Sequence, residues 1–255
     1  MCRFLAYLGP DVSLESLLLA PPWSLLRQSY EPRFMRRGKV NADGFGAGWY
    51  DFGVREEPAL YRRATPIWSD RTFASIAGLA HSGAILAAVR NATAPSPTEE
   101  SNTPPFTSGR WLFAHNGEVA GFATGGRRTL LQGVSDRRAA EIGGSTDSEV
   151  LFAMVLDRID AGASPSVALS DVVGAVMEST GGRLNMVLTD GHTVAATACG
   201  DSLYVQEDAP GFVVASEPYD DRPGWREVAD GSVIEAIEAT AVGSLFRLRI
   251  GGMSR

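Results

Sequence analysis

The chain has 255 residues, of which 44% are hydrophobic and 21% charged, and its formal net charge is −7. A chain of this length can bury a sizeable core without disulfides, and no apolar run reaches the roughly 20 residues that span a bilayer. The negative charge, with arginines scattered rather than clustered, argues against binding to nucleic acid or anionic lipid. We therefore expect a soluble globular protein with neither a nucleic-acid nor a membrane partner.

The sequence also indicates the cellular location of the protein and the redox state of its cysteines. Residues 1–20 lack the basic start, long apolar stretch and cleavage site of a signal peptide, so a cytoplasmic location is expected. The only cysteines are Cys2 and Cys199, and a reducing compartment keeps both as thiols.

The first half of the chain is rich in predicted strands. The apolar stretch 2–9 is typical of a buried strand, and residues 13–30 favour helix on both sides of a Pro-Pro break. A further helix is predicted over 70–80. The remaining strand predictions in this half cover 45–52, 59–64, 84–93 and 110–119.

The second half begins with the clearest helix signal. Thr146 and Glu149 have the spacing of a capping box in front of an apolar-periodic run, which predicts a helix over 145–162. A second helix is predicted over 166–180, and Asp190-Gly191 is typical of a hairpin turn. Later strand predictions cover 183–190, 192–199, 202–206, 211–218 and 244–250.

Strands, two successive helices and more strands indicate a layered α+β architecture rather than a parallel α/β fold. Two polar stretches, 94–109 and about 121–144, are interpreted as long functional loops because core-like elements flank each of them. We expect residues 1–255 to form a single domain.

Cys2 is the most reactive candidate in the sequence. A thiol needs a base to become a nucleophile, and if Met1 is removed, the α-amine of Cys2 itself can take the proton, since α-amines have a reference pKa of about 7.7–8.0. Without other signals, however, a cysteine in second position is more often a small buried hydrophobe at the start of a strand.

Three further motifs have both a structural and a functional interpretation. Asn116-Gly117 is commonly a tight turn, but its amide and backbone N–H could also face an oxyanion. Arg90 ends an apolar strand, where a guanidinium could clamp a carboxylate. Asp147 suits the positive end of a helix dipole, and it could instead pair with a substrate ammonium.

Cofactor motifs find no support in the sequence. The glycine-rich stretch 41–49 spells G-x-G-x-G and leads into a predicted strand, which does not fit a dinucleotide site, and no P-loop occurs. The three histidines are far apart, and there is no CxxC or HExxH spacing. We expect neither a cofactor nor a metal.

In combination and in this order, Cys2, "VRNAT", "HNG" and "TDSE" resemble the glutaminase domain of class II glutamine amidotransferases, which are N-terminal-nucleophile hydrolases. The resemblance implies a four-layer αββα sandwich in which Cys2 attacks a γ-glutamyl amide. It also implies Asn116 and Gly117 as the oxyanion hole, Arg90 on the substrate α-carboxylate and Asp147 on its α-ammonium.

A second resemblance covers nearly the whole chain. The stretches "PPWSLLRQSYEPR", "NADGFGAGW", "AAVRNAT", "LNMVLTDG" and "VVASEPYDDRPGW" are similar to the amidohydrolases of ergothioneine biosynthesis, which remove glutamate from γ-glutamyl-hercynylcysteine sulfoxide. This resemblance implies a small-molecule γ-glutamyl substrate, with other pathway enzymes linked only through shared metabolites. Within "VRNAT", Thr93 is a further expected substrate-binding residue.

The leaving group of such a substrate carries a trimethylammonium group, which aromatic faces and carboxylates bind well. We therefore expect Tyr219, with Asp220 and Asp221 and together with Trp49, on the leaving-group side of the pocket, although "SEPYDD" could equally be a polar turn.

Three functions stay open on the sequence. The first is an amidohydrolase that acts through a Cys2 thioester on the sulfoxide substrate. The second is hydrolysis of glutamine or of glutathione-like γ-glutamyl compounds, and the third is a non-catalytic binding module on the same fold.

Overall fold

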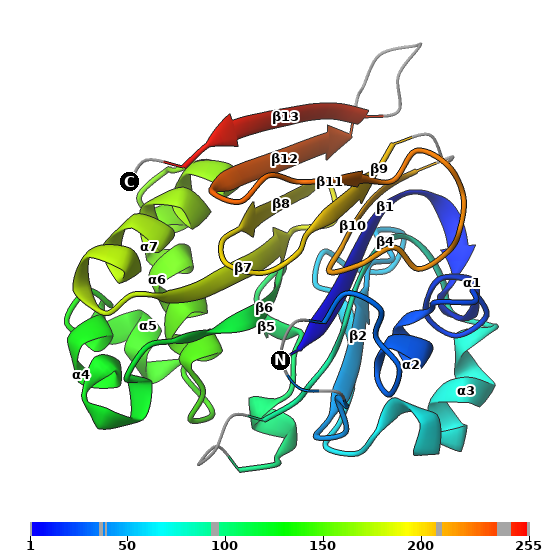
Figure 1. Cartoon of the computed structure of the whole chain (residues 1–255), viewed down its shortest axis with the longest axis horizontal. Helices are drawn as coiled ribbons and strands as arrows, with labels where there is room; N and C mark the ends of the chain where they lie inside the picture. The colour runs from blue at the N-terminus through cyan, green and yellow to red at the C-terminus, as the bar shows by residue number, and fades with distance from the viewer. Residues whose placement is uncertain are drawn as a thin grey trace.

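The computed structural model describes residues 2–35, 38, 40–92, 97–207, 211–238 and 246–253. Within these ranges, two antiparallel β-sheets pack face to face and helices cover both outer faces (Figure 1). The first sheet has the order β11 (Arg226–Glu227), β9 (Tyr204–Gln206), β10 (Phe212–Ala215), β1 (Arg3–Ser13), β4 (His81–Val89), β2 (Phe45–Trp49), β3 (Ala59–Arg63). The second has the order β13 (Phe246–Gly252), β12 (Ser232–Glu238), β8 (Thr193–Ala198), β7 (Gly182–Thr189), β6 (Trp111–Val119), β5 (Phe106–Ser108).

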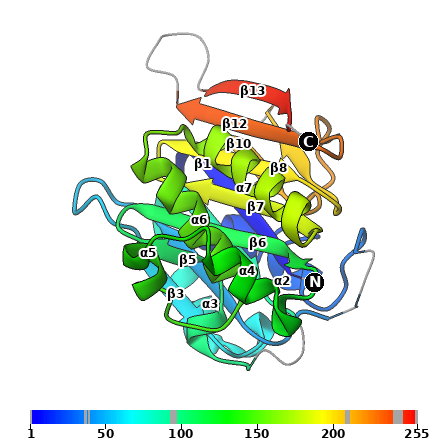
Figure 2. The ribbon, with the colours of Figure 1, turned by 90° about the vertical axis from the view of Figure 1, so that its left-hand side faces the viewer.

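The helices are divided between the two outer faces, as the two views show (Figures 1 and 2). Helices on the first sheet are α1 (Leu14–Leu18), α2 (Leu25–Gln28) and α3 (Arg71–Ala77), with the 3₁₀-helix η1 (Ile67–Ser69) before α3. Helices on the second sheet are α4 (Gly126–Leu131), α5 (Asp136–Ala140), α6 (Asp147–Asp160) and α7 (Pro165–Ser179). Two more 3₁₀-helices, η2 (Glu100–Asn102) and η3 (Phe122–Thr124), lie in the connections around β5 and β6. The α+β, four-layer αββα fold class is thereby confirmed.

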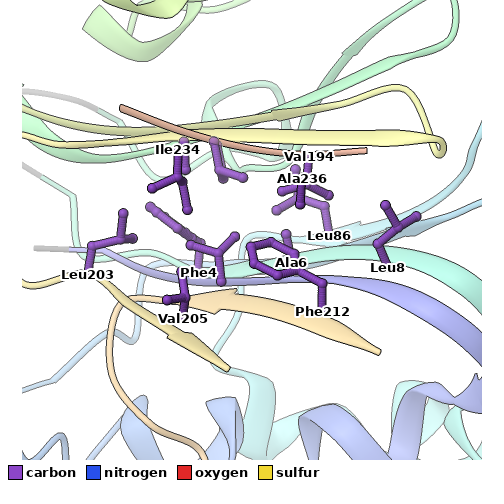
Figure 3. Close-up of a cluster of buried hydrophobic side chains, with 14 of the residues drawn as sticks. Phe4, Ala6, Leu8, Leu86, Val194, Leu203, Val205, Phe212, Ile234 and Ala236 are labelled. Carbon is purple, nitrogen blue, oxygen red and sulfur yellow. The ribbon is translucent and has the colours of Figure 1, made fainter. Parts of the chain in front are cut away.

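The period-two alternation of strand side chains builds the inner layer of the core. From β1, Phe4, Ala6 and Leu8 enter the apolar cluster between the sheets (Figure 3), while Leu5 and Tyr7 join the cluster under the helices. Both faces of the strand are therefore buried, which explains why its sequence is almost continuously apolar.

Helix α6 begins as the sequence predicts. Thr146 is its N-cap, and Glu149 completes the capping box by accepting from the backbone N–H of Thr146. The carboxylate of Glu149 also accepts from the backbone of Gly144, so the turn that leads into the helix is fixed from two sides. This local arrangement makes Asp147 the first helical residue.

The sequence prediction was incomplete or wrong in several places. The stretch 121–144 is not a long loop, because it contains η3, α4 and α5. Strand β12 was not predicted, and the loop expected over 94–109 contains η2 and β5. The Asp190-Gly191 hairpin turn is confirmed between β7 and β8, with Gly191 at a φ of 89°.

The described part of the chain contains no helix that is both long and apolar enough to cross a membrane.

Candidate active site

A pocket of about 610 Å³ opens where the two sheets and helix α6 meet. Cys2, Arg90, Gly117 and Asp147 all line it, so the structure brings together four of the residues that the sequence singled out. Strand pairing brings together the pocket residues at the ends of β1 and β4. The start of β1 lies beside the end of β4, since Arg3 is opposite Val89, and it lies next to the end of β6 in both views (Figures 1 and 2).

Cys2 immediately precedes β1 and is a half-buried free thiol on the pocket wall. The strand behind it is held on both sides, by β4 and by β10. Met1 lies outside the described residues. The thiol stands directly before a strand that is paired on both sides.

Asn116 and Gly117 do not form a turn, because β6 continues through both residues to Val119. Leu112 and Ala114 of the same strand belong to the cluster between the sheets, so alternation puts the Asn116 side chain on that inner face. Asn116 is fully buried, and neither polar atom of its amide has a hydrogen-bond partner among the described residues. Such an amide is costly to bury unless it has a ligand to bind.

Gly117 lies where no side chain would fit. A Cβ atom built at this position would lie 1.8 Å from the carbonyl oxygen of Arg183 on β7 and 2.5 Å from Nε2 of His115. Glycine is therefore required for close strand packing here. Gly117 also lines the pocket.

Arg90 follows β4 and is 4% exposed, yet it lines the pocket. Its Nη1 donates to the carbonyl oxygens of Asp43, at 3.4 Å, and Pro97, at 3.2 Å. A guanidinium that is fixed by backbone carbonyls and mostly removed from water is well suited to a ligand carboxylate, because its planar fork can bind both oxygens.

Asp147 is held in place before any ligand binds. Its Oδ2 accepts from the backbone N–H of Val119 at 2.9 Å, and the hydroxyl of Ser148 donates to its Oδ1 at 3.3 Å. The carboxylate also stands at the N-terminus of the 14-residue helix α6, where the helix dipole favours negative charge. These contacts fix the carboxylate at the wall of the pocket.

His115 is a site residue to which the sequence assigned no role. It is buried, and its Nε2 lies 3.0 Å from the carbonyl oxygen of Arg183, so this nitrogen carries the proton. Its Nδ1 lies 3.1 Å from Oγ of Ser148 and 3.9 Å from Oδ1 of Asp147. The ring therefore connects β6 to the first turn of α6. The motif "HNG" was the sequence feature that could have identified His115 as a site residue.

The residues expected on the leaving-group side are not brought to the pocket. Tyr219 is 4% exposed and packs in the cluster under the helices of the first sheet, against Trp225, and burial raises its pKa. Asp220 accepts from Nε1 of Trp225, Asp221 accepts from Nε1 of Trp23, and Trp49 packs against the same cluster.

Thr93 lies outside the described residues. Part of the remaining pocket wall comes from Glu118 in β6 and from Phe122, Thr124 and Arg127 in the stretch after that strand. Among the residues that the structure describes, no group of three or more His, Cys, Asp or Glu side chains could hold a metal ion.

Comparison with known proteins identifies the family. The family of class-II glutamine amidotransferases matches residues 28–221, which is more than half of the chain. The chain belongs to the class-II glutamine amidotransferases. It is 40% identical over 239 residues to the γ-glutamyl-hercynylcysteine sulfoxide hydrolase of Mycobacterium tuberculosis, covering 93% of this chain and 94% of that protein. It is 39% identical over 248 residues to the protein of the same name from Mycolicibacterium smegmatis, covering 95% and 98%.

Among solved structures, this amidotransferase chain resembles a glutamine aminotransferase class-II domain protein from Silicibacter pomeroyi. The TM-score is 0.70 and the identity 28%, and the match covers 100% of both chains. The similarity thus extends over the full described fold and is not limited to the pocket.

Proposed function

We propose that this chain is a γ-glutamyl amidohydrolase that converts γ-glutamyl-hercynylcysteine sulfoxide to glutamate and hercynylcysteine sulfoxide, a step of ergothioneine biosynthesis. The observation that carries the proposal is the 40% identity, over nearly the full length of both chains, to relatives named for this hydrolysis. The pocket supports it independently, because it combines a thiol, a guanidinium and a carboxylate around one cavity.

In this proposal the two charged residues bind the amino-acid head of the substrate. Arg90 binds the α-carboxylate through its guanidinium fork, and Asp147 binds the α-ammonium. With both ends of the head held, the γ-carbonyl is the part that reaches Cys2, which is the positioning that accelerates an attack. Selectivity for γ-glutamyl compounds follows from this pair.

Cys2 supplies the nucleophile once Met1 has been removed. Its α-amine takes the thiol proton as Sγ bonds to the γ-carbonyl carbon, and the negative charge moves to the carbonyl oxygen. The Asn116 amide and the Gly117 N–H stabilise this oxyanion. The Asn116 amide, which has no hydrogen-bond partner among the described residues, supports this role, because the oxyanion would give its Nδ2 an acceptor.

The tetrahedral species then loses the amine. The C–N bond breaks, the α-ammonium of Cys2 returns its proton to the leaving nitrogen, and a γ-glutamyl thioester remains on Sγ. Water attacks this thioester with the α-amine again as base, the C–S bond breaks, and glutamate leaves with the thiol restored. All protons are exchanged between Cys2, the substrate and water, so the cycle needs no cofactor.

The remaining expectations belong to the same proposal. We infer that residues 1–255 form one domain, supported by the continuous apolar cluster between the sheets. A reducing cytoplasm suits an enzyme whose nucleophile must stay a thiol, and Cys2 and Cys199 are both free. The partners are then small γ-glutamyl molecules rather than macromolecules.

The test is glutamate release from γ-glutamyl-hercynylcysteine sulfoxide, glutathione and glutamine by one preparation, with intact mass recorded to establish whether Met1 is absent. The proposal expects the highest kcat/KM on the sulfoxide substrate and no release by Cys2→Ala. Preference for glutathione or glutamine would keep the Cys2 chemistry but overturn the substrate. Undiminished release by Cys2→Ala would overturn the mechanism.

A further inference from the structure

The charged side chains around the pocket differ in the partners they already have. The described part of the pocket wall carries two cations and two carboxylates, namely Arg90, Arg127, Glu118 and Asp147. Backbone groups hold Arg90 and Asp147, and Glu118 accepts at 3.3 Å from Nη2 of Arg183, which does not line the pocket. Arg127 forms no hydrogen bond or ion pair with any residue that the structure describes. Its guanidinium is therefore the charged group of this wall that is available to a ligand.

The pocket has a buried end and an exposed rim. Arg90 and Phe106 are buried, whereas the rim is exposed in two places. One part of the rim is Pro97 and Ser145, beside Arg90 and Asp147, and the other is the stretch from Glu118 to Arg127.

In the proposed function, the amino-acid head of the substrate occupies the end of the pocket that Arg90 and Asp147 form. The amine side of the scissile bond then extends past Cys2 toward the other part of the rim. The leaving group therefore meets the wall that carries Arg127.

The segment before Arg127 is held by its own backbone. The N–H groups of Thr124 and Gly126 both donate to the carbonyl oxygen of Gly121 at 3.0 Å, and the hydroxyl of Thr124 donates to the same oxygen at 3.2 Å. Gly121 has a φ of 63°, which favours glycine. Leu130, one turn further along α4, is buried under the helices of the second sheet. The backbone at Arg127 is thus fixed, so that binding has to order only its side chain.

The leaving group of the proposed substrate is itself an amino acid. The nitrogen that hydrolysis releases is the α-amine of a cysteine derivative, so a carboxylate is attached to the carbon next to the scissile amide. Glutamine releases ammonia and offers no such carboxylate. The planar fork of a guanidinium can bind both oxygens of a carboxylate, and a hydrogen bond to a charged group changes a binding constant by about 10- to 100-fold.

We propose that Arg127 is a specificity-determining residue that binds the α-carboxylate of the leaving amino acid. The pocket then prefers γ-glutamyl compounds whose amine portion is an amino acid over glutamine. The inference rests on the proposed function, in which Arg90 and Asp147 hold the glutamyl head. Glu118 on the same wall forms no ion pair with Arg127, because its carboxylate is engaged by Arg183.

The first test measures binding without turnover. In a Cys2→Ala protein, calorimetry gives the Kd of γ-glutamylglycine and of γ-glutamylglycinamide, which lacks only the carboxylate. Adding Arg127→Gln is expected to raise the Kd of γ-glutamylglycine about 10- to 100-fold and to change that of γ-glutamylglycinamide by less than about 2-fold. An equal rise for both compounds, or no rise for either, would overturn the inference.

Arg128→Gln is the matched control for this test. Arg128 is the next residue and is also exposed, but it lines only a neighbouring hollow, whereas Arg127 lines both that hollow and the pocket of Cys2. Arg128→Gln is expected to leave both Kd values within about 2-fold of the Cys2→Ala protein. If it weakened γ-glutamylglycine as much as Arg127→Gln does, the effect would be general electrostatics and the proposed contact would be wrong.

The second test uses the active protein. Arg127→Gln is expected to lower kcat/KM for γ-glutamyl-hercynylcysteine sulfoxide about 10- to 100-fold and to leave kcat/KM for glutamine within about 2-fold. Arg127→Lys keeps the charge but loses the fork, so its kcat/KM for the sulfoxide substrate should lie between those of the parent and Arg127→Gln. A loss by the same factor on both substrates would make Arg127 merely structural.

The two tests separate the two proposals. Failure of the parent protein to release glutamate from any γ-glutamyl substrate would remove the proposed function, while the Kd values of the two glycine compounds would still report on Arg127. Hydrolysis of the sulfoxide substrate that does not depend on Arg127 would keep the proposed function and overturn the role of this arginine.

Discussion

Asn116 and Asn185 form a natural comparison. They are directly opposite each other in the pairing of β6 with β7, and both are fully buried. The Asn116 amide has no hydrogen-bond partner among the residues described, whereas the Asn185 amide has four contacts. Asn185 donates to the carbonyls of Asp201 and Ser202, at 2.9 and 3.1 Å, and accepts from the N–H groups of Cys199 and Asp201, at 2.8 and 3.2 Å.

Replacing each asparagine with leucine should separate catalysis from stability. Asn116→Leu removes one of the two proposed oxyanion donors, and this is expected to lower kcat by about 100- to 1,000-fold. It also removes an unpaired buried amide, whose desolvation costs about 1–3 kcal/mol, while a change of shape costs up to about 1.5 kcal/mol. The free energy of unfolding should therefore change by between a loss of about 0.5 kcal/mol and a gain of about 3 kcal/mol.

Asn185→Leu should have the opposite profile. Four hydrogen bonds at a net value of about 1 kcal/mol each predict a loss of about 4 kcal/mol, because four backbone groups lose their partner. For a chain of this size, that loss corresponds to a decrease in Tm of roughly 8–16 °C. Molecules of this variant that remain folded should retain part of their activity, since the oxyanion donors are unchanged.

The assay combines thermal unfolding with glutamate release at saturating substrate. Asn116→Leu is expected to lose about 100- to 1,000-fold in kcat and to be about as stable as the parent or more stable, and Asn185→Leu to be markedly less stable. If Asn116→Leu loses as much Tm as Asn185→Leu, the Asn116 amide is held by structural contacts and its assignment to the oxyanion is wrong.

Three further predictions follow from individual residues. Asp147→Asn keeps an acceptor for the backbone N–H of Val119 but loses the negative charge. Losing a charge-assisted hydrogen bond to the substrate ammonium should raise KM about 10- to 100-fold and leave kcat little changed. An unchanged KM would contradict ammonium binding by Asp147. Tyr219→Phe should leave KM for the sulfoxide substrate unchanged, because Tyr219 packs away from the pocket, and a several-fold increase would return it to the leaving-group side. Burial raises the pKa of Tyr7 from 10.0 to about 12, so its neutral form stabilises the fold below pH 10 and this contribution is lost as the pH rises from 10 to 12. The free energy of unfolding, measured with urea at pH values across that range, should fall less steeply with pH for Tyr7→Phe than for the parent.

Local signals predicted much of the fold. The capping box specified the start of α6 and therefore the position of Asp147 at the helix N-terminus. The apolar strands around β1 and β4 were predicted because both of their faces are buried. By contrast, β12 was missed because alanine and glutamate do not favour strands, and pairing with β8 overrides that preference.

Contacts between segments that are far apart in the chain could not be predicted from the sequence. The motif that contains Arg90 was visible, but its closeness to Cys2 depends on the register of β1 against β4. Tyr219 could not be assigned to one side of its sheet from its neighbours alone. The buried Arg3 guanidinium, which has no hydrogen-bond partner among the described residues, also had no sequence signature, since this depends on how the surrounding loops pack.

Some pocket residues also hold the fold together, whereas others come from a connecting segment, and the two groups should tolerate substitution differently. Asp147 and His115 connect helix α6 to β6 as well as lining the cavity, so replacing either one loosens the packing of two layers. Phe122, Thr124 and Arg127 come from the segment between β6 and α6 and belong to neither sheet. Mutational drift is therefore free to remodel that side of the cavity, while the side that we propose binds the glutamyl head is tied to the stability of the fold itself. If that proposal holds, relatives with this architecture should differ in the group cleaved from glutamate long before they differ in binding glutamate.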